Sequence, residues 1–297
     1  MSRPPSVGVV IPTRGDRPLP LREAVEAVLV QDYPGELSVV VVVDGAPACP
    51  VAAQLGRSVR VLPNRLTPGL PGARNTGIAA CATDLIAFCD DDDVWLPGKL
   101  TAQVRALREA GGEFASCGIE VEHGRRRVTR LAGTSAVTVA DLVRSRMMMV
   151  HSSTFLFERG VLTPDEGAPG GQNEDWDLAL RAAKRRPLVH VDRPLVLVRW
   201  AGSHYAARWA DRIAGLEWML ARHPELAVDP CGAARVYGQL AFSHAALGQR
   251  RAALRWAARA FSARRAEPRA PLALAVAAGL VSPSRILSAL HNRGHGI

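Results

Sequence analysis

Short apolar runs alternate with amphipathic segments through the first third of the chain. The runs are rich in valine and other apolar residues and end in polar ones, which is typical of buried strands. The segments between them repeat apolar residues at helical spacing. This alternation predicts a parallel sheet covered by helices on both faces. The expected strands are 6–13, 37–45, a weaker 58–63, and 84–90, and the expected helices are 19–31 and 73–83.

The middle of the chain continues with mixed elements. An amphipathic pattern ended by glycines predicts a helix, and two polar-apolar runs joined by the sequence HGRRR predict a hairpin. A Gly- and Pro-rich loop over 163–172 separates a further strand from a further helix. The expected elements are a helix over 96–112, the hairpin over 114–132, a strand within 150–162, a helix over 173–186 and the last strands within 188–200.

The final part of the chain has a different pattern. From residue 206 onward alanine, arginine and leucine recur at helical spacing, with no strand pattern. We therefore expect an α/β domain over residues 1–205 and a small all-α extension over residues 206–297.

The composition is that of a globular protein, with 48% hydrophobic residues in 297. No apolar stretch reaches the roughly 20 residues that cross a bilayer, and the N-terminus lacks the pattern of a signal peptide. The five cysteines are scattered and form no CxxC pair, which favours reduced thiols over a zinc site or a disulfide framework. We expect a cytoplasmic protein.

The net charge of +9 favours anionic partners. The basic residues are almost all arginine, however, and genome composition is an alternative explanation. The sequence contains no nucleic-acid-binding motif, so we expect no nucleic acid partner.

Polar residues stand at the ends of three expected strands. Thr13, Asp44 and Asp90 each follow an apolar run. Ligands of parallel α/β sheets bind outside the carboxyl ends of the strands. We therefore expect these three side chains to converge on one edge, as a nucleotide site requires.

Four consecutive aspartates, Asp90 to Asp93, follow the third strong strand. A run of like charge is usually solvated, but this one lies between a buried strand and the apolar turn at Trp95. Hard divalent cations take carboxylate oxygens as ligands, and Mg²⁺ binds one or two carboxylates together with substrate phosphates. In an extended chain Asp90 and Asp92 would face one side and Asp91 the other, while Asp93 would cap the next turn.

A second acidic cluster follows the Gly-rich loop. Asn173 could cap a helix whose first turn holds Glu174, Asp175 and Asp177, which stabilise the helix dipole. The loop favours a functional role as well, because a lid that ends in acids can present a carboxylate to a substrate and exclude water.

The chain resembles the family 2 glycosyltransferases of the GT-A fold, inverting enzymes that use nucleotide-diphosphate sugars. The resemblance runs from about Ser6 to His204 and rests on five motifs in order: VVIPTRGD, VVVDGAP, GLPGARNTGI, FCDDDDVWLPGKL and NEDWDLALRAA. It implies a Rossmann-like, mainly parallel sheet flanked by helices. Two positions depart from the family pattern, Val43 in place of an aspartate and Arg14 in place of an aromatic residue, so base and ribose recognition stay open.

The resemblance also implies a role for each matching residue. Asp175 would be the catalytic base, with Glu174 and Trp176 on the acceptor side. Mn²⁺ or Mg²⁺ would bind Asp92, Asp90 and His204. The donor nucleotide would contact Pro12, Thr13, Arg14, Asp44, Arg74, Asn75, Asp90 and Asp91.

The implied reaction transfers a sugar from a nucleotide-diphosphate sugar to an acceptor hydroxyl on a polysaccharide, a specialised metabolite or a peptide. The base would accept the acceptor's proton during attack on the anomeric carbon, while positive charge would stabilise the leaving diphosphate. Two alternatives stay open. One is a catalytically silent module that binds a nucleotide sugar or a partner, and the other is a nucleotidyltransferase.

The C-terminal extension contains a stretch similar to a tetratricopeptide-type helix pair, with Gly248 at its turn. One unit is too few for an independent solenoid. The Arg-rich segment 250–269 is a candidate for peripheral membrane contact, at the inner face of the membrane, or for peptide contact, and a solvated helix face is the plainer alternative.

Overall fold

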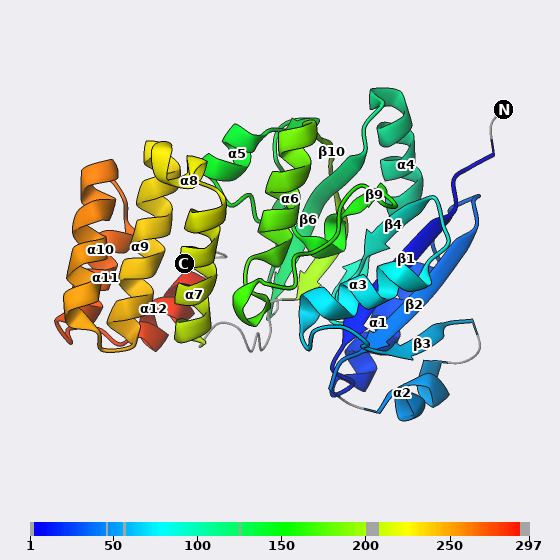
Figure 1. Cartoon of the computed structure of the whole chain (residues 1–297), viewed down its shortest axis with the longest axis horizontal. Coiled ribbons are helices and arrows are strands. Elements are labelled where there is room, and N and C mark those ends of the chain that lie inside the picture. Colours follow the sequence, from blue (N-terminus) through cyan, green and yellow to red (C-terminus); the bar gives the residue numbers. More distant parts are fainter. Residues whose placement is uncertain (1–2, 46, 56–57, 125, 200–207, 292–297) are drawn as a thin grey trace. The chain divides into compact units, whose positions relative to one another are not determined.

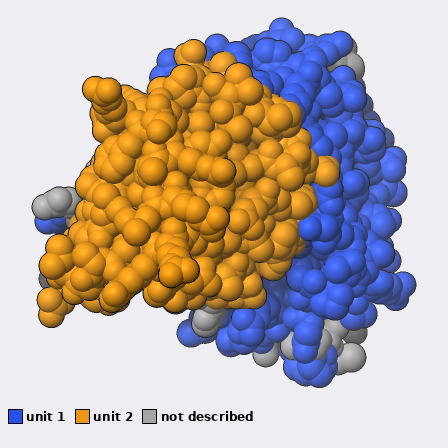
Figure 2. Space-filling view, turned by 60° about the vertical axis from the view of Figure 1, so that its left-hand side comes forward, with its two compact units in different colours: residues 1–139, 147–167, 174–199 blue, residues 140–146, 168–173, 200–297 orange. Residues whose placement is uncertain are grey.

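The computed structural model describes residues 3–45, 47–55, 58–124, 126–199 and 208–291. The chain forms two compact units, coloured separately in Figure 2. Unit 1 comprises Met1–Val139, Met147–Gly167 and Glu174–Arg199, and unit 2 comprises Ala140–Arg146, Ala168–Asn173 and Trp200–Ile297. The expected boundary between residues 205 and 206 lies outside the described residues.

Unit 1 is built on one mixed sheet flanked by helices, as predicted (Figure 1). Its first four strands run parallel in the order β3-β2-β1-β4, and β9, β6, β10 and β5 continue the sheet. Strand β9 is antiparallel to both of its neighbours. The strands are β1 (Val7–Thr13), β2 (Leu37–Val43), β3 (Arg60–Pro63), β4 (Leu85–Phe88), β5 (Val94–Trp95), β6 (Phe114–His123), β7 (Arg126–Arg130), β8 (Ala136–Val137), β9 (Leu156–Glu158) and β10 (Leu188–Arg199).

Helices cover the sheet because its central strands are apolar on both faces. Every residue of β1 is buried, as are the last five residues of β2, so neither face can be left to solvent. Helix α3 approaches β1 closely at Gly77, where a Cβ would lie 2.2 Å from Val10. The helices of this unit include α1 (Pro18–Leu29), α2 (Ala48–Leu55), α3 (Leu70–Ala80), α4 (Lys99–Ala110) and α6 (Glu174–Arg185). Helix α5 (Val139–Arg144) follows β8 and, apart from Val139, belongs to unit 2.

Two expectations for the later strands need correction. The expected strand within 150–162 is confined to β9, because the Ser-rich segment before it forms a 3₁₀ turn, η1 (Ser152–Thr154). The last strands within 188–200 form a single strand, β10, whose register against β6 shifts around Pro194. The hairpin is confirmed, with β6 and β7 antiparallel and His123 opposite Arg126.

The described part of residues 200–297 is helical, as predicted. Asp229 accepts hydrogen bonds from the backbone of Cys231 and Gly232, at 2.9 and 2.8 Å, and so caps α9. The α9–α10 turn contains Gly248 at φ 74°. No helix among the described residues is long and apolar enough to cross a membrane. The helices are α7 (Trp209–Arg222), α8 (Glu225–Val228), α9 (Pro230–Ala246), α10 (Arg250–Ala263), α11 (Arg269–Ala277) and α12 (Pro283–His291).

Candidate functional site

The carboxyl ends of β1, β2 and β4 meet at one edge of the sheet. Thr13 is the last residue of β1, and the backbone N–H of Asp44, just after β2, donates to its carbonyl at 2.8 Å. Cys89, just after β4, donates in the same way to Val10 at 3.2 Å. The topology therefore brings Thr13, Asp44 and Asp90 to the same edge.

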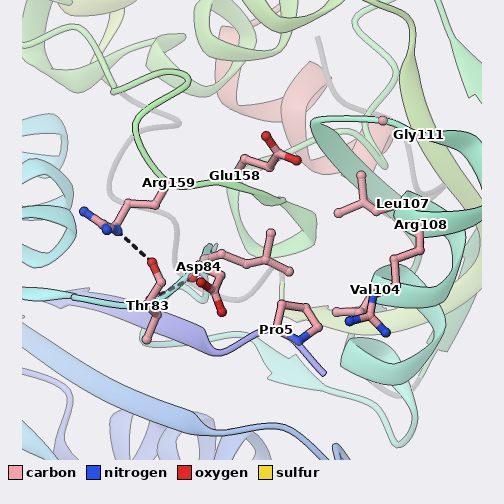
Figure 3. Close-up of a pocket in the computed structure, with 11 residues that line it drawn as sticks. Pro5, Thr83, Asp84, Val104, Leu107, Arg108, Gly111, Glu158 and Arg159 are labelled. Carbon is pink, nitrogen blue, oxygen red and sulfur yellow. Dashed lines mark hydrogen bonds between the residues drawn. The ribbon is translucent and has the colours of Figure 1, made fainter. Parts of the chain in front are cut away.

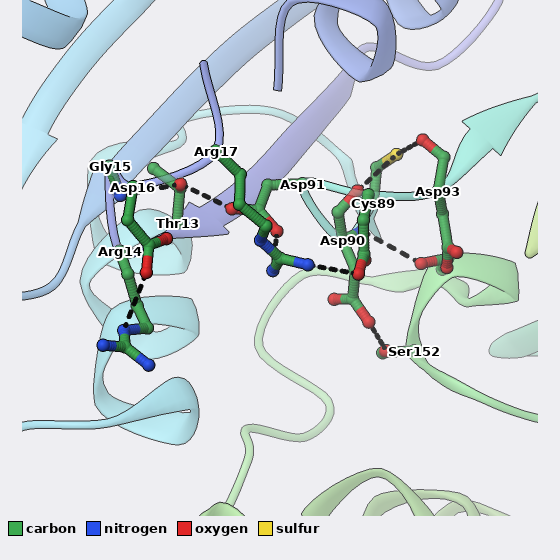
Figure 4. Close-up of polar contacts among 12 residues, drawn as sticks. Thr13, Arg14, Gly15, Asp16, Arg17, Cys89, Asp90, Asp91, Asp93 and Ser152 are labelled. Carbon is green, nitrogen blue, oxygen red and sulfur yellow. Dashed lines mark hydrogen bonds and ion pairs between the residues drawn. The ribbon is translucent and has the colours of Figure 1, made fainter. Parts of the chain in front are cut away.

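Arg17 bridges two of the four aspartates (Figure 4). It lies in the loop after β1 and donates to Asp91 Oδ1 at 2.5 Å and to Asp92 Oδ2. Thr13 Oγ1 donates to the other oxygen of Asp91 at 2.6 Å. The Asp91 side chain is 3% exposed, whereas those of Arg17 and Asp92 are 36% and 32% exposed. Arg17 is thus anchored on a buried carboxylate and holds a more open one.

Arg74 makes a second bridge deeper in the fold. It projects from α3, is completely buried, and donates to Asp90 Oδ1 at 2.5 Å and to Glu174 Oε1. Its guanidinium also lies 5.2 Å from the centre of the Phe88 ring. Arg74 therefore ties the strand-end aspartates to the first turn of α6.

Asp90 is held from a third direction by the segment before β9. Ser152 Oγ donates to its carboxylate at 2.8 Å, and its backbone N–H donates to Ser153 Oγ at 2.9 Å. Asp90, Asp93 and His151 each bring one possible ligand atom within 4.8 Å of the other two. Two carboxylates and an imidazole therefore share a space small enough for one metal ion.

The four aspartates do not alternate as they would in a strand. Strand β4 ends at Phe88, and the run forms a turn in which the N–H of Asp93 donates to Asp90 at 3.2 Å. Asp91 and Asp92 consequently share Arg17, while Asp90 groups with Asp93. The expected alternation of the four side chains is wrong, because it assumed extended backbone beyond the strand. The roles of Asp90 and Asp92 as metal ligands stay a prediction.

Crowding and burial make these carboxylates costly to ionise. Burial raises the pKa of Asp91 to about 6, against the pull of Thr13 and Arg17. The pKa of Asp92 is raised mainly by burial and also by the negative charge of Asp90. The pKa of Asp93 is raised mainly by burial and also by the charges of Asp90 and Asp92. A divalent cation would relieve both the repulsion and the lost hydration. The oxygen-rich set, with one imidazole in reach, fits Mn²⁺ or Mg²⁺.

Asp44 and Asn75 are engaged in holding loops. Asp44 accepts hydrogen bonds from Asn64 Nδ2 at 2.7 Å and from Gly69 N at 2.9 Å, which fixes the loop before α3. Asn75 donates to Pro164 O at 3.0 Å and to Glu166 Oε1 at 2.7 Å. The Asn75 contacts connect the middle of α3 to the loop that follows β9.

The start of α6 brings Glu174, Asp175 and Trp176 to the same region. Glu174 is 2% exposed and Trp176 is 1% exposed, whereas Asp175 is half-buried and accepts from the backbone of Trp176 at 2.8 Å. Burial raises the pKa of Glu174, although Arg74 opposes the shift. Asn173 does not have the extended backbone of an N-cap; its φ is 62°, a left-handed conformation that asparagine tolerates. Asp175 is therefore the accessible acid of this turn.

Two further expected residues lie apart from this network, and a third lies outside the described residues. Pro12 is buried within β1. Arg14 is 68% exposed and lies 3.6 Å from the Asp16 carboxylate. His204 lies outside the described residues, so its expected role as a ligand stays a prediction.

Several partners of the acids were not predicted from the sequence. Arg17 and Ser152 were not singled out, and no ligand role was predicted for His151. A signal for Arg17 existed, since four adjacent carboxylates need a positive partner and Arg17 stands in the loop that ends β1. The contact between Arg17 and Asp91, 74 positions apart, follows from the β1–β4 pairing.

A pocket of about 550 Å³ lies at the opposite edge of the sheet (Figure 3). Its walls come from the segments that lead into β1 and β4, the end of α4 and the end of β9. Its polar groups are partly engaged, with Arg159 donating to Thr83 O at 2.7 Å and Asp84 accepting from Ser6 Oγ at 2.8 Å. None of the expected site residues lines it, and the acidic network lies at the other ends of the strands.

Comparison with protein families gives one match over most of the chain. The model described as glycosyltransferase like family 2 matches residues 4–191. Among curated relatives, the UDP-Glc:alpha-D-GlcNAc-diphosphoundecaprenol beta-1,3-glucosyltransferase WfgD of Escherichia coli is 26% identical over 126 residues. That match covers 42% of this chain and 49% of WfgD, so the chain matches about half the length of this relative.

Two solved structures share the fold. S. aureus TarS 1–349 in complex with UDP-GlcNAc has a TM-score of 0.61 at 14% identity, covering 98% of this chain and 92% of that chain. The mannosyltransferase PcManGT from Pyrobaculum calidifontis, in complex with GDP-Man and Mn²⁺, has a TM-score of 0.51 at 20% identity, covering 96% and 83%. These likenesses agree with a mainly parallel sheet flanked by helices.

Proposed function

This chain belongs to the glycosyltransferase-like family 2, and from that premise we propose that it transfers a sugar from a nucleotide-diphosphate sugar to an acceptor hydroxyl, with inversion. The observation that carries the proposal is the network of acids at the carboxyl edge of the sheet. Asp90 to Asp93, Arg74 and the start of α6 are joined there by direct ion pairs and short contacts. The proposed donor site and the proposed base would thus lie next to each other.

The donor side is proposed to comprise the four aspartates, Thr13 and Arg17. Asp92 and Asp90 would hold Mn²⁺ or Mg²⁺, with His151 as a further candidate ligand beside His204. The bound cation would neutralise negative charge on the diphosphate as the sugar leaves. Arg17 stands at the open side of Asp92, 36% exposed, so its guanidinium can contact a phosphate oxygen if the cation takes its place on that carboxylate.

Asp175 is proposed as the base. It is half-buried at the first turn of α6, and its negative charge is one of those that raise the pKa of Arg74. A carboxylate in that position can accept the proton of the acceptor hydroxyl while the oxygen attacks the anomeric carbon from the face opposite the diphosphate. Displacement in one step inverts the anomeric centre.

Glu174 and Trp176 were expected on the acceptor side, and we assign them a supporting role instead. Both are almost fully buried, so neither offers a free surface to an acceptor. Glu174 binds Arg74, and the Trp176 ring packs in the interior. Together they fix the turn that presents Asp175.

The donor and acceptor are proposed by class. The names of the similar proteins include UDP-Glc, UDP-GlcNAc and GDP-Man, so uridine and guanosine donors are both candidates. Val43 and Arg14 stand where the family motif has other residue types, which leaves base recognition to experiment. WfgD is named for a diphosphoundecaprenol acceptor, and a hydroxyl of a lipid-linked or polysaccharide sugar is accordingly our first choice.

The test is a thermal-shift and calorimetric screen of nucleotide sugars with and without Mn²⁺. We expect one nucleotide class to raise the unfolding temperature only when Mn²⁺ is present. Binding without turnover on any acceptor would favour the silent binding module, and release of pyrophosphate from a sugar phosphate and a nucleoside triphosphate would favour a nucleotidyltransferase.

The base assignment has its own test. Asp175→Asn should lower kcat about 10²- to 10⁴-fold and leave donor affinity nearly unchanged, because the amide keeps the shape but accepts no proton. The matched control is Asp165→Asn in the loop before α6, where the carboxylate accepts from Gly167 N at 2.8 Å. Full turnover in Asp175→Asn would remove the assignment.

A further inference from the structure

The net positive charge of the chain comes from its last quarter. Residues 230–297 contain ten arginines, no lysine and one acidic residue, Glu267. The whole chain has 37 basic and 28 acidic residues, so residues 1–229 hold 27 of each and are neutral. A general preference for arginine in the genome does not explain this, because the same genome encodes the balanced part.

Helix α10 presents the densest part of this charge to solvent. Its buried face consists of small residues that pack in the core of the helical unit. Its outer face carries arginines four residues apart, which form one row along the helix. The buried residues are Ala253, Ala257 and Ala260, and the exposed row is Arg251, Arg255 and Arg259.

The α10 row has no acid of its own to neutralise it. The segment 230–266 contains no aspartate or glutamate, and Glu267 accepts from Arg269 Nη1 at 2.8 Å. Like charges along one row repel each other, so the row stabilises neither the helix nor the unit. A negatively charged partner would remove this cost.

Exposed aliphatic side chains accompany the arginines. Leu254, on the same face of α10, is 54% exposed. The turn before α10 carries Leu247, which is 41% exposed, and the turn after α11 carries Leu280 and Val281, which are 78% and 37% exposed. Short connections join α9, α10 and α11, so each helix runs antiparallel to the one before it. The turn before α10 and the turn after α11 therefore both lie at the N-terminal end of α10, where Arg250 and Arg251 are.

We propose that the outer face of α10 and the adjoining turns bind the surface of a membrane that contains anionic lipids. Arginines contact lipid phosphates, and aliphatic side chains enter the boundary between headgroups and acyl chains. A nucleic acid would be bound by the same charges, but single-stranded binders stack bases on open aromatic rings. The two aromatic rings of α10 are engaged instead. Trp256 packs 5.3 Å from the Tyr237 ring and has Arg259 over it at 4.8 Å, and Phe261 packs against the core of the helical unit.

The proposal is tested with the full chain and sedimented vesicles. Vesicles of phosphatidylcholine alone are compared with vesicles in which about one lipid in three is phosphatidylglycerol. We expect binding only to the anionic vesicles, and loss of that binding at high salt because the interaction is screened. The triple variant Arg251→Gln, Arg255→Gln, Arg259→Gln should bind at least about 100-fold more weakly.

A matched control removes the same net charge from unit 1. Arg22, Arg105 and Arg185 are all exposed, and their substitution by glutamine should leave vesicle binding within about threefold. Leu254→Ser tests the apolar contribution independently and should weaken binding about fivefold or more. Circular dichroism of each variant checks that the helical unit stays folded.

Three outcomes would overturn the proposal. The wild-type chain could fail to bind anionic vesicles, it could bind neutral vesicles equally well, or the control variant could lose as much binding as the α10 variant. Tighter binding to duplex or single-stranded DNA than to vesicles at the same salt, lost in the α10 variant, would identify a nucleic acid partner instead. None of these readouts depends on glycosyl transfer.

Discussion

Arg74 and Arg17 do the same chemical task in two different surroundings. Each bridges two carboxylates of the candidate site, but Arg74 is completely buried, whereas Arg17 is 36% exposed. Burial lowers the pKa of Arg74, yet Glu174 and Asp90 raise it overall, so it stays charged inside the fold. We therefore expect the Arg74 bridge to be a permanent part of the fold and the Arg17 bridge to open when a ligand binds.

The largest effect is expected from breaking the buried bridge. Arg74→Met keeps the volume but leaves Glu174 buried without its cation, and it removes one partner of Asp90. Loss of one member of a buried pair destabilises by about 3–5 kcal/mol. Urea denaturation at neutral pH, compared with the wild type, measures the free energy of unfolding. A loss below about 1 kcal/mol would show that the Arg74 bridge is as replaceable as that of Arg17.

The double variant Arg74→Met, Glu174→Met tests whether the two buried charges are coupled. Removing both charges relieves the unpaired buried acid, so we expect recovery of about 2 kcal/mol relative to Arg74→Met alone. Asp90 keeps its bonds to Ser152 and Ser153, which limits its own contribution. Simple additivity of the two single variants in the same denaturation experiment would mean that the two side chains are not coupled.

The smallest effect on stability is expected from the open bridge. Arg17→Gln should change the free energy of unfolding by no more than about 1 kcal/mol, because its side chain and that of Asp92 are partly solvated. It should also tighten the binding of Mn²⁺ to the protein alone about fivefold, since the guanidinium competes for Asp92.

The control for this variant is Arg14→Gln, which removes one charge from the same loop without touching the aspartates. Titration of free Mn²⁺ by electron paramagnetic resonance measures both affinities. Weaker Mn²⁺ binding in Arg17→Gln than in Arg14→Gln would contradict an exchangeable bridge and assign Arg17 a supporting role for the aspartates.

The sequence predicted the layers of the fold well because they depend on local patterns. Valine-rich runs identified β1 and β2, and the glycine after an amphipathic repeat identified the end of α4. The sequence predicted the backbone beyond β4 less well. Four aspartates in an extended chain alternate, but the strand ends at Phe88 and the chain turns, which depends on contacts with Ser152 and Ser153.

The candidate site was predicted as a set of residue types and not as a network. The motifs located the acids. Arg17, however, pairs with Asp91 and Asp92, which follow it in the chain by 74 and 75 positions. Such contacts are determined by strand order, which no local period encodes. The burial of Glu174 and Trp176 likewise follows from packing of α6 and is invisible in the acidic motif itself.

The close approach of α3 to β1 at Gly77 predicts where inactivating mutations should occur. Gly77 lies three residues after Arg74 on α3, and a methyl group there would lie 2.2 Å from Val10. Any larger residue would push the helix outward and withdraw the guanidinium from Asp90 and Glu174. A screen for inactive variants should therefore recover substitutions at position 77, even though this residue has no side chain to meet a substrate.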